Sequence, residues 1–120
     1  MKKESELIAG ALKSRPYTIC VDFDGTLAVQ GKWRGYQHIG APIMSVIKKI
    51  RRAKRRGVKI VIHSCRVSTL DNRIHLESID VMRKWLKDND VPFDEIWCSS
   101  GKPYADMYIE DRAAKPDDEF

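Results

Sequence analysis

The sequence is poor in the residues that build disulfide frameworks and cysteine metal centres, and it has no long apolar run. Its 120 residues include three cysteines, and no two of them form a Cys-x-x-Cys pair. This excludes a complete disulfide framework and a cysteine zinc site, and it favours a reducing compartment. No stretch approaches the ~18 apolar residues of a membrane span. Acidic residues interrupt the short apolar run near the N-terminus, unlike in a signal peptide. We therefore expect a cytoplasmic protein without membrane contact.

The composition is that of an ordinary globular domain. Hydrophobic residues make up 42% and charged residues 32% of the chain, which excludes disordered and collagen-like classes. No repeat or low-complexity linker divides the sequence, so we expect one domain over residues 1–120. Residues 1–16 are expected to form a helical extension and residues 112–120 a short tail. The 22 Lys and Arg exceed the 17 Asp and Glu, giving a net charge of +5 that raises the question of an anionic partner.

Apolar runs of strand length alternate with amphipathic helical patterns. The first two runs are nearly continuous in apolar and β-branched residues, which is typical of strands buried on both faces. The expected strands cover residues 17–23, 58–63, 93–98 and 107–110. Helical periodicity over 43–56 and 70–89 separates the first three strands. The pattern predicts an α/β, three-layer Rossmann-like domain with about four parallel strands, helices on both faces and no large cap.

The last expected strand has unusual neighbours in the sequence. Only about eight residues connect the third expected strand to the fourth, and a parallel crossover usually has more. No fifth strand is expected after it, so the fourth strand should lie at an edge of the sheet. Exposed edges are usually covered or paired, which leaves a homo-oligomer open.

Two carboxylates stand at the end of the first expected strand, in the string Asp22-Phe-Asp24-Gly-Thr-Leu27. Residues i and i+2 of an extended chain point the same way, about 6.5–7 Å apart. Carboxylates that face one cleft repel each other unless a cation or a proton lies between them. Gly25 permits a sharp turn directly after them. The string therefore indicates a site rather than an acidic turn.

These six residues resemble the first motif of the haloacid-dehalogenase superfamily of phosphohydrolases and phosphotransferases. Matches to its other motifs follow in order: Ser64 after an apolar strand, Lys102 in Gly-Lys-Pro, and the pair Glu110-Asp111 after the last strand. The resemblance extends from about residue 18 to residue 113. The region from Lys102 onward looks like small capless members from phages and bacterial surface-polysaccharide clusters, and like the phosphatase domains of polynucleotide kinase-phosphatases. Those relatives usually carry Asp where Glu110 stands.

The resemblance implies a role for each matched residue. Asp22 would be the nucleophile that forms an aspartyl-phosphate, and Asp24 the general acid and base. Ser64 would donate a hydrogen bond to a phosphoryl oxygen, and Lys102 would neutralise charge on the nucleophile and the phosphoryl group. Mg²⁺ is the implied cofactor. Its expected ligands are Asp22, the backbone carbonyl of Asp24, Asp111, and Glu110 directly or through water.

Further residues are expected near the substrate. Gly25 and Thr26 belong to the turn of the first motif, and Trp33 and Arg34 lie where the superfamily's flap covers the site. Arg66 is expected either to contact a substrate anion or to form a surface salt bridge.

The cysteines are expected to be buried and inert. Cys65, in the string His-Ser-Cys-Arg, does not indicate a cysteine phosphatase, because Asp71 stands where that chemistry needs its arginine. Trp85 and Trp97 are expected in the core.

The sequence therefore predicts a small Mg²⁺-dependent phosphatase whose substrate is a phosphorylated small molecule or a nucleic-acid end. The alternatives are a nucleic-acid 3′-end phosphatase, a sugar-phosphate or nucleotide phosphatase, and a non-catalytic binding module. The presence of Asp22 argues against the module, because such modules usually lose the nucleophile.

The positive charge is concentrated in one segment. Residues 43–59 hold eight basic residues and no acidic one, and without them 14 basic residues face 17 acidic ones. Such a helix either exposes a solvated face or contacts a polyanion such as nucleic acid.

Overall fold

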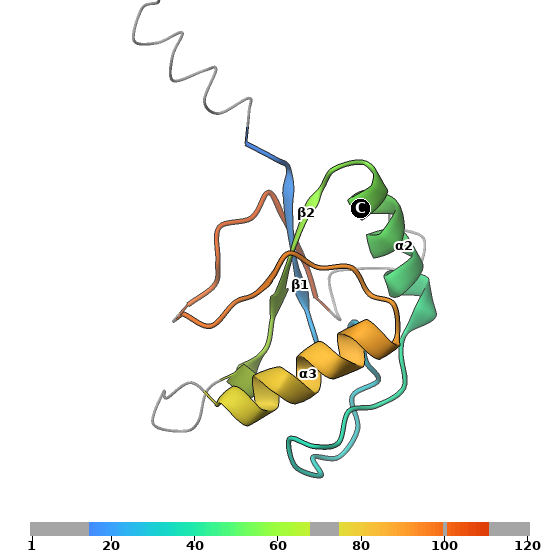
Figure 1. The fold of residues 1–120 in the computed structure, drawn as a ribbon, viewed down its shortest axis with the longest axis vertical. Coiled ribbons are helices and arrows are strands. Elements are labelled where there is room, and N and C mark those ends of the chain that lie inside the picture. Colours follow the sequence, from blue (N-terminus) through green and yellow to red (C-terminus); the bar gives the residue numbers. More distant parts are fainter. Residues whose placement is uncertain (1–14, 68–74, 100, 111–120) are drawn as a thin grey trace, which may run out of the picture.

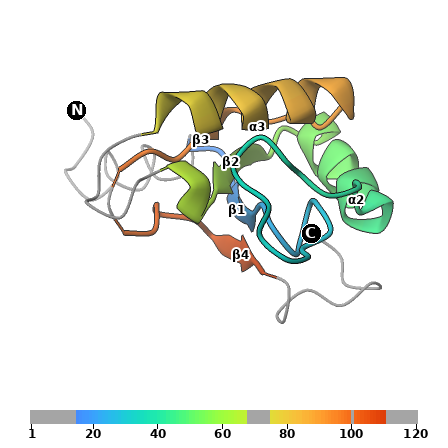
Figure 2. The same ribbon diagram turned by 90° about the horizontal axis from the view of Figure 1, so that it is seen from below.

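The computed structural model describes residues 15–67, 75–99 and 101–110, which form a parallel α/β fold. Its strands are β1 (Thr18–Asp22), β2 (Lys59–His63), β3 (Glu95–Ile96) and β4 (Met107–Ile109). They form one parallel sheet in the order β3-β2-β1-β4 (Figure 2). Helix α2 (Met44–Arg55) connects β1 to β2, and α3 (Leu76–Asp88) precedes β3 (Figure 1). The predicted class and parallel sheet are confirmed.

Strand β1 is the centre of the sheet because it pairs on both sides. Its backbone runs beside β2 from Thr18 to Asp22 and beside β4 from Ile19 to Val21. Ile19 and Val21 are 0% exposed, and Cys20, on the opposite face, is 3% exposed. Burial on both faces explains the continuous apolar run of this segment.

The helices are arranged differently from the expectation of helices on both faces. Side chains of α2 and α3 join the same core cluster as alternate residues of β1 and β2. The members from these four elements are Ile19, Val21, Ile47, Ile50, Ala53, Ile60, Ile62, Ile79, Met82 and Leu86. Cys20 and Val61 are buried outside this cluster, and the β3–β4 segment passes on the side of the sheet away from α2 (Figures 1 and 2). Two right-handed crossovers in one direction along a sheet leave their helices on one face. The part of the chain that the structure describes has no helix on the other face.

Several element boundaries differ from the sequence pattern. The third strand is two residues long instead of covering 93–98, although backbone hydrogen bonds from Asp94 and Trp97 to β2 continue the pairing on both sides of it. Helix α3 begins at Leu76, and residues 70–74 of the expected helix lie outside the described residues. The same holds for most of the expected N-terminal extension and for the tail.

The two tryptophans expected in the core differ from each other. Trp85 packs against the core cluster, with its ring edge-to-face to Phe23 at 5.1 Å, as expected. Trp97 is not part of that cluster. Its indole N–H donates to the carbonyl of Gly101 at 2.9 Å. The expectation for Trp97 was wrong because β3 is an edge strand with a loop, and no helix, over that position.

Strand β4 is an edge of the sheet, as predicted, and side chains tie the segment before it to β1. The Asp106 carboxylate accepts the Thr18 N–H at 2.7 Å, which lowers the pKa of Asp106. Arg15 donates to the Tyr104 hydroxyl at 2.6 Å and lies 4.1 Å from the centre of its ring. The short β3–β4 connection is therefore anchored at its end as well as by the sheet.

In the described ranges, none of the helices combines the length and the apolar character that crossing a bilayer requires.

Three cations of the basic segment, residues 43–59, contact other segments of the domain. Lys54 binds both oxygens of Asp94 at 2.6 and 2.8 Å, and Lys59 lies 3.7 Å from Glu95. Arg51 donates to the backbone carbonyls of Asn89 and Asp90. These three cations hold α2 and β2 to the segment that leads into β3, and contact of the helix over 43–56 with a polyanion remains a prediction.

The Asp94 carboxylate is expected to stabilise the fold in a pH-dependent way. Burial raises the pKa of Asp94, but the hydrogen bonds from Lys54 and from the Ile60 N–H together lower it by more, so the net shift is downward. A carboxyl whose pKa is lower in the folded state stabilises above its unfolded pKa and ceases to do so as the pH falls through the folded value. Asp94→Asn should therefore lower the unfolding free energy by about 1–2 kcal/mol at pH 7, and by much less near pH 3.

Urea unfolding at both pH values measures this difference. Asp80→Asn, at an exposed position of α3, is the matched control and should leave the unfolding free energy nearly unchanged. A loss for Asp94→Asn that is the same at pH 7 and pH 3 would contradict the assignment.

Candidate functional site

A cavity of about 860 Å³ opens where β1 and β2 end. Ligand pockets commonly occupy about 300–1,000 Å³. In open parallel sheets, ligands bind beyond the carboxyl ends of the strands, where the strand order reverses, and here that point lies between β1 and β4. Of the residues predicted from the sequence, the cavity is lined by Asp22, Asp24, Trp33, Arg34, Ser64, Arg66, Lys102 and Glu110. The fold thus brings together residues that are up to 88 positions apart.

Asp22 lies at the last position of β1 with its carboxylate partly open to the cavity. The parallel register places His63 directly beside it, with Nδ1 3.3 Å from Asp22 Oδ1. Sequence reasoning did not single out His63 as a neighbour of Asp22. The signal was present, because Asp22 and His63 each end a buried apolar run and neighbouring parallel strands end together.

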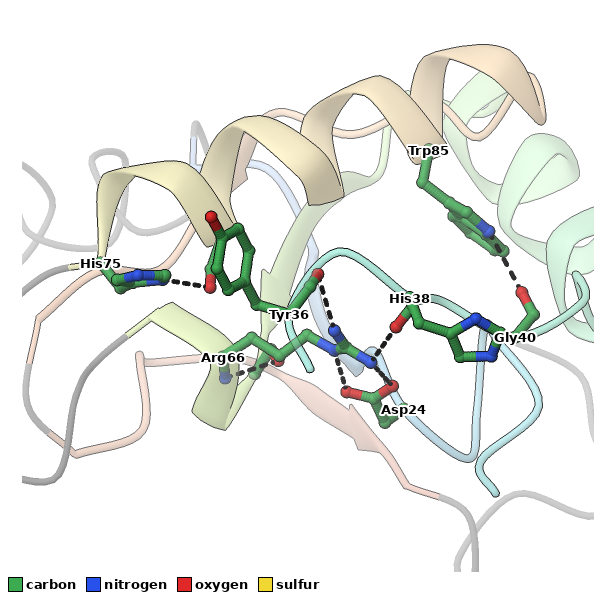
Figure 3. Close-up of polar contacts among 9 residues, drawn as sticks. Asp24, Tyr36, His38, Gly40, Arg66, His75 and Trp85 are labelled. Carbon is green, nitrogen blue, oxygen red and sulfur yellow. Dashed lines mark hydrogen bonds and ion pairs between the residues drawn. The ribbon is translucent and has the colours of Figure 1, made fainter. Parts of the chain in front are cut away.

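Asp24 is held by Arg66 in a bidentate ion pair. Arg66 Nε lies 2.7 Å from Oδ2 and Nη2 lies 3.0 Å from Oδ1. The Arg66 side chain is 8% exposed. Its guanidinium also donates to the backbone carbonyls of Tyr36 and His38 (Figure 3). The expected salt bridge of Arg66 is therefore present but partly buried rather than at the surface, and contact of Arg66 with a substrate anion remains a prediction.

Gly25 and Thr26 form the turn and do not line the cavity. Gly25 has φ 85°, a conformation that glycine adopts at little cost, and its N–H donates to the carbonyl of Ala28. Thr26 is 2% exposed, and its hydroxyl has no hydrogen-bond partner among the described residues. These two residues shape the turn that separates Asp24 from the following segment, and their contact with substrate remains a prediction.

Ser64 directly follows β2, and a short 3-10 turn (Cys65–Val67) begins after it. Its Oγ accepts the backbone N–H of Arg66 at 3.0 Å. A hydroxyl that accepts one hydrogen bond keeps its own proton to donate. Since Ser64 lines the cavity, this proton is available to an anion there.

Lys102 and Glu110 form an ion pair at the cavity wall. The hydrogen bond to Glu110 raises the pKa of Lys102, and the same bond lowers the pKa of Glu110. Asp22 is close enough to contribute to the raised pKa of Lys102. Glu110 thus neutralises the lysine that was expected to face the nucleophile, a contact that the sequence did not indicate.

The expected Mg²⁺ ligands are only partly described. Asp111 lies outside the described residues. Within residues 15–67, 75–99 and 101–110, no group of three or more His, Cys, Asp or Glu side chains is placed to hold a metal ion. The oxygen donors of Asp22, Asp24 and Glu110 at one cavity are nevertheless of the kind that Mg²⁺ prefers. The donor chemistry of the described site therefore fits Mg²⁺.

The cysteines do not share one environment. Cys20 is buried, and burial together with the nearby Asp22 raises the pKa of its thiol to about 11. Cys98 is partly buried. Cys65 is exposed and lines the cavity, so the expectation of a buried thiol was wrong there. The chain leaves the sheet after Ser64, and in the turn that begins at Cys65 the side chain that enters the core is that of Val67.

Residues 29–42, called the flap below, extend from the turn after Asp24 and cover one side of the cavity. At their base, Val29 N–H donates to the carbonyl of Ala41 at 2.8 Å, and the Trp85 indole donates to the carbonyl of Gly40 at 3.2 Å (Figure 3). Trp33 is 64% exposed and, like Arg34, lines the cavity. Their predicted place beside the site agrees with the structure.

Gly40 is expected to be indispensable at the base of the flap. A Cβ atom there would lie 2.0 Å from the carbonyl oxygen of Val29, which is backbone and cannot turn away. Gly40→Ala should therefore lower the unfolding free energy by about 1–3 kcal/mol. Gly31→Ala is the matched control in the same segment, because nothing lies within 4 Å of its added Cβ. Urea unfolding checks both variants, and equal effects at the two glycines would contradict the flap geometry.

Comparison with known proteins finds solved structures that resemble this chain. No protein-family model and no curated protein matches the chain. A target protein from Vibrio cholerae of known structure is 31% identical, with 83% of this chain and 84% of that chain covered and a TM-score of 0.57. A conserved protein from Bacteroides thetaiotaomicron is 24% identical over 82% of this chain and 78% of that chain, with a TM-score of 0.60. A chain of the Pnkp1/Rnl/Hen1 complex is 17% identical over 85% of this chain and 31% of that chain, with a TM-score of 0.54. The last two similarities concern the fold.

Proposed function

We propose that the chain belongs to the haloacid-dehalogenase superfamily and is a Mg²⁺-dependent phosphatase that hydrolyses phosphomonoesters. The fold is one that phosphatases use. The observation that carries the proposal is the presence of Asp22, Asp24, Ser64 and Lys102 around one cavity at the carboxyl end of β1. Phosphoryl transfer depends mainly on positioning and on stabilisation of charge, and these side chains supply both.

The chemistry proceeds in two steps. The Asp22 carboxylate attacks phosphorus, and the bond to the leaving oxygen breaks while Asp24, which enters this step protonated on a lone pair that Arg66 does not use, gives that oxygen its proton. Asp24 then removes a proton from water, which attacks the aspartyl-phosphate and releases phosphate. The Ser64 hydroxyl donates to a phosphoryl oxygen, and Lys102 offsets its negative charge.

Mg²⁺ supplies the positive charge that allows a carboxylate to approach a phosphate dianion. The residues that would hold it are Asp22, Asp24 through its backbone carbonyl, Asp111 and Glu110. Asp22 and Glu110 line the described cavity from neighbouring strands β1 and β4.

The candidate substrate classes are inferred from the open side of the cavity, which is lined by the exposed flap residues Trp33 and Arg34. A ring and a cation beside a phosphate site suit sugar phosphates, nucleotides and 3′-phosphorylated nucleic-acid ends. A screen of these three classes, with Mg²⁺ and with a chelator, selects among them. Nucleic acid that binds through the basic helix would also show a steep dependence on salt.

Asp22→Asn is the direct test of the reaction. An amide cannot form the aspartyl-phosphate, so release of phosphate from p-nitrophenyl phosphate with Mg²⁺ should fall to the level of buffer alone. EDTA should do the same to the unchanged protein. Asp80→Asn, which removes an exposed carboxylate on α3, should keep full activity.

Two outcomes would reject the proposal. Activity that survives Asp22→Asn would exclude the nucleophile. A folded protein that releases no phosphate from p-nitrophenyl phosphate or from any substrate of the screen would instead be the non-catalytic module.

A further inference from the structure

Arg66 has more partners than an ion pair requires. Two of its nitrogens hold the two oxygens of Asp24, at 2.7 and 3.0 Å. Two also donate to the backbone carbonyls of Tyr36 and His38, at 3.3 and 3.1 Å. Figure 3 shows the guanidinium between the carboxylate and the two carbonyls. An almost buried cation with its donors used on two separate segments is costly unless every contact is made.

Both carbonyls belong to the middle of the flap. The Trp33 ring lies over the same guanidinium, with its centre 4.8 Å away. Tyr36 of the same part of the flap lies edge-on to the ring of His75, which directly precedes α3, at 4.7 Å. Arg66 is therefore the polar connection between the flap and the first motif.

We propose that Arg66 is a positioning residue that couples the flap to Asp24, so that closure of the flap and orientation of the acid–base carboxylate occur together. The proposal rests on the function proposed above. A guanidinium that binds both carboxylate oxygens fixes the plane of the carboxylate, which a lysine ammonium cannot do. The same group ties the flap carbonyls to that orientation.

The coupling has a consequence that depends on the leaving group. An alkyl phosphate such as β-glycerol phosphate needs a proton from Asp24 as its bond to phosphorus breaks. The nitrophenolate of p-nitrophenyl phosphate leaves without that help. A carboxylate that is present but poorly oriented should therefore slow the first substrate far more than the second.

Arg66→Gln and Arg66→Lys test this inference, with Arg83→Gln at an exposed position of α3 as the matched control. Both Arg66 variants should lower kcat for β-glycerol phosphate by about 10²-fold or more, and kcat for p-nitrophenyl phosphate by much less, with little change in KM. Asp24→Asn should show the same selectivity. The control should match the unchanged protein.

Combining Asp24→Asn with Arg66→Gln tests whether Arg66 acts through Asp24. If it does, the double variant should be no slower on β-glycerol phosphate than Asp24→Asn alone. Losses that multiply would overturn the proposal. If Arg66→Gln does not fold, Arg66→Lys in the same combination decides the question.

Amide hydrogen exchange tests the flap side of the coupling. Exchange at residues 33–38 should be faster in Arg66→Gln than in the unchanged protein, and Arg83→Gln should not alter it. Unchanged exchange in the flap would overturn the coupling, and so would a rise in KM for both substrates with no change in kcat, because that result marks a substrate contact. An unchanged protein without phosphatase activity would instead reject the proposed function itself.

Discussion

The parallel pairing of β1 with β2 and β4 is the constraint on which the site depends. Because three strands end at one edge of the sheet, Asp22, His63 and Glu110 meet there although their segments are distant in the sequence. The pairing also buries β1 on both faces, which fixes its register. A shift by one residue would turn Asp22 toward the core and would turn Phe23, which is 0% exposed, out of it. Packing and chemistry therefore select the same register.

Each described carboxylate of the site has a partner. Asp24 faces Arg66, Glu110 faces Lys102, and Asp22 faces His63. An acidic cleft without such partners would destabilise the fold through repulsion. A phosphate group and Mg²⁺ that enter this cavity would compete with the existing pairs, so binding and rearrangement of the site are linked. The arginine pair is the most buried of the three, which is why it can transmit the position of the flap.

Much of the fold was predictable from local pattern, and less of the site was. Apolar runs marked the four strands, and the string from Asp22 to Leu27 marked the cavity, because both signals lie in consecutive residues. The shared face of α2 and α3 depends on the order of the strands, which periodicity does not contain. The pairing of Arg66 with Asp24 depends on the pairing of β1 with β2, which brings the segments after both strands together, and the exposure of Cys65 depends on the turn after Ser64.

The proposed reaction depends most on Asp22, which takes up the phosphoryl group. Rapid acid quenching during turnover of p-nitrophenyl phosphate with Mg²⁺, followed by borohydride reduction and mass spectrometry of the peptides, tests it directly. Reduction of an aspartyl-phosphate leaves homoserine, so we expect homoserine at position 22 and unmodified aspartate at position 24. Homoserine at another position, or none at all while phosphate is being released, would contradict it.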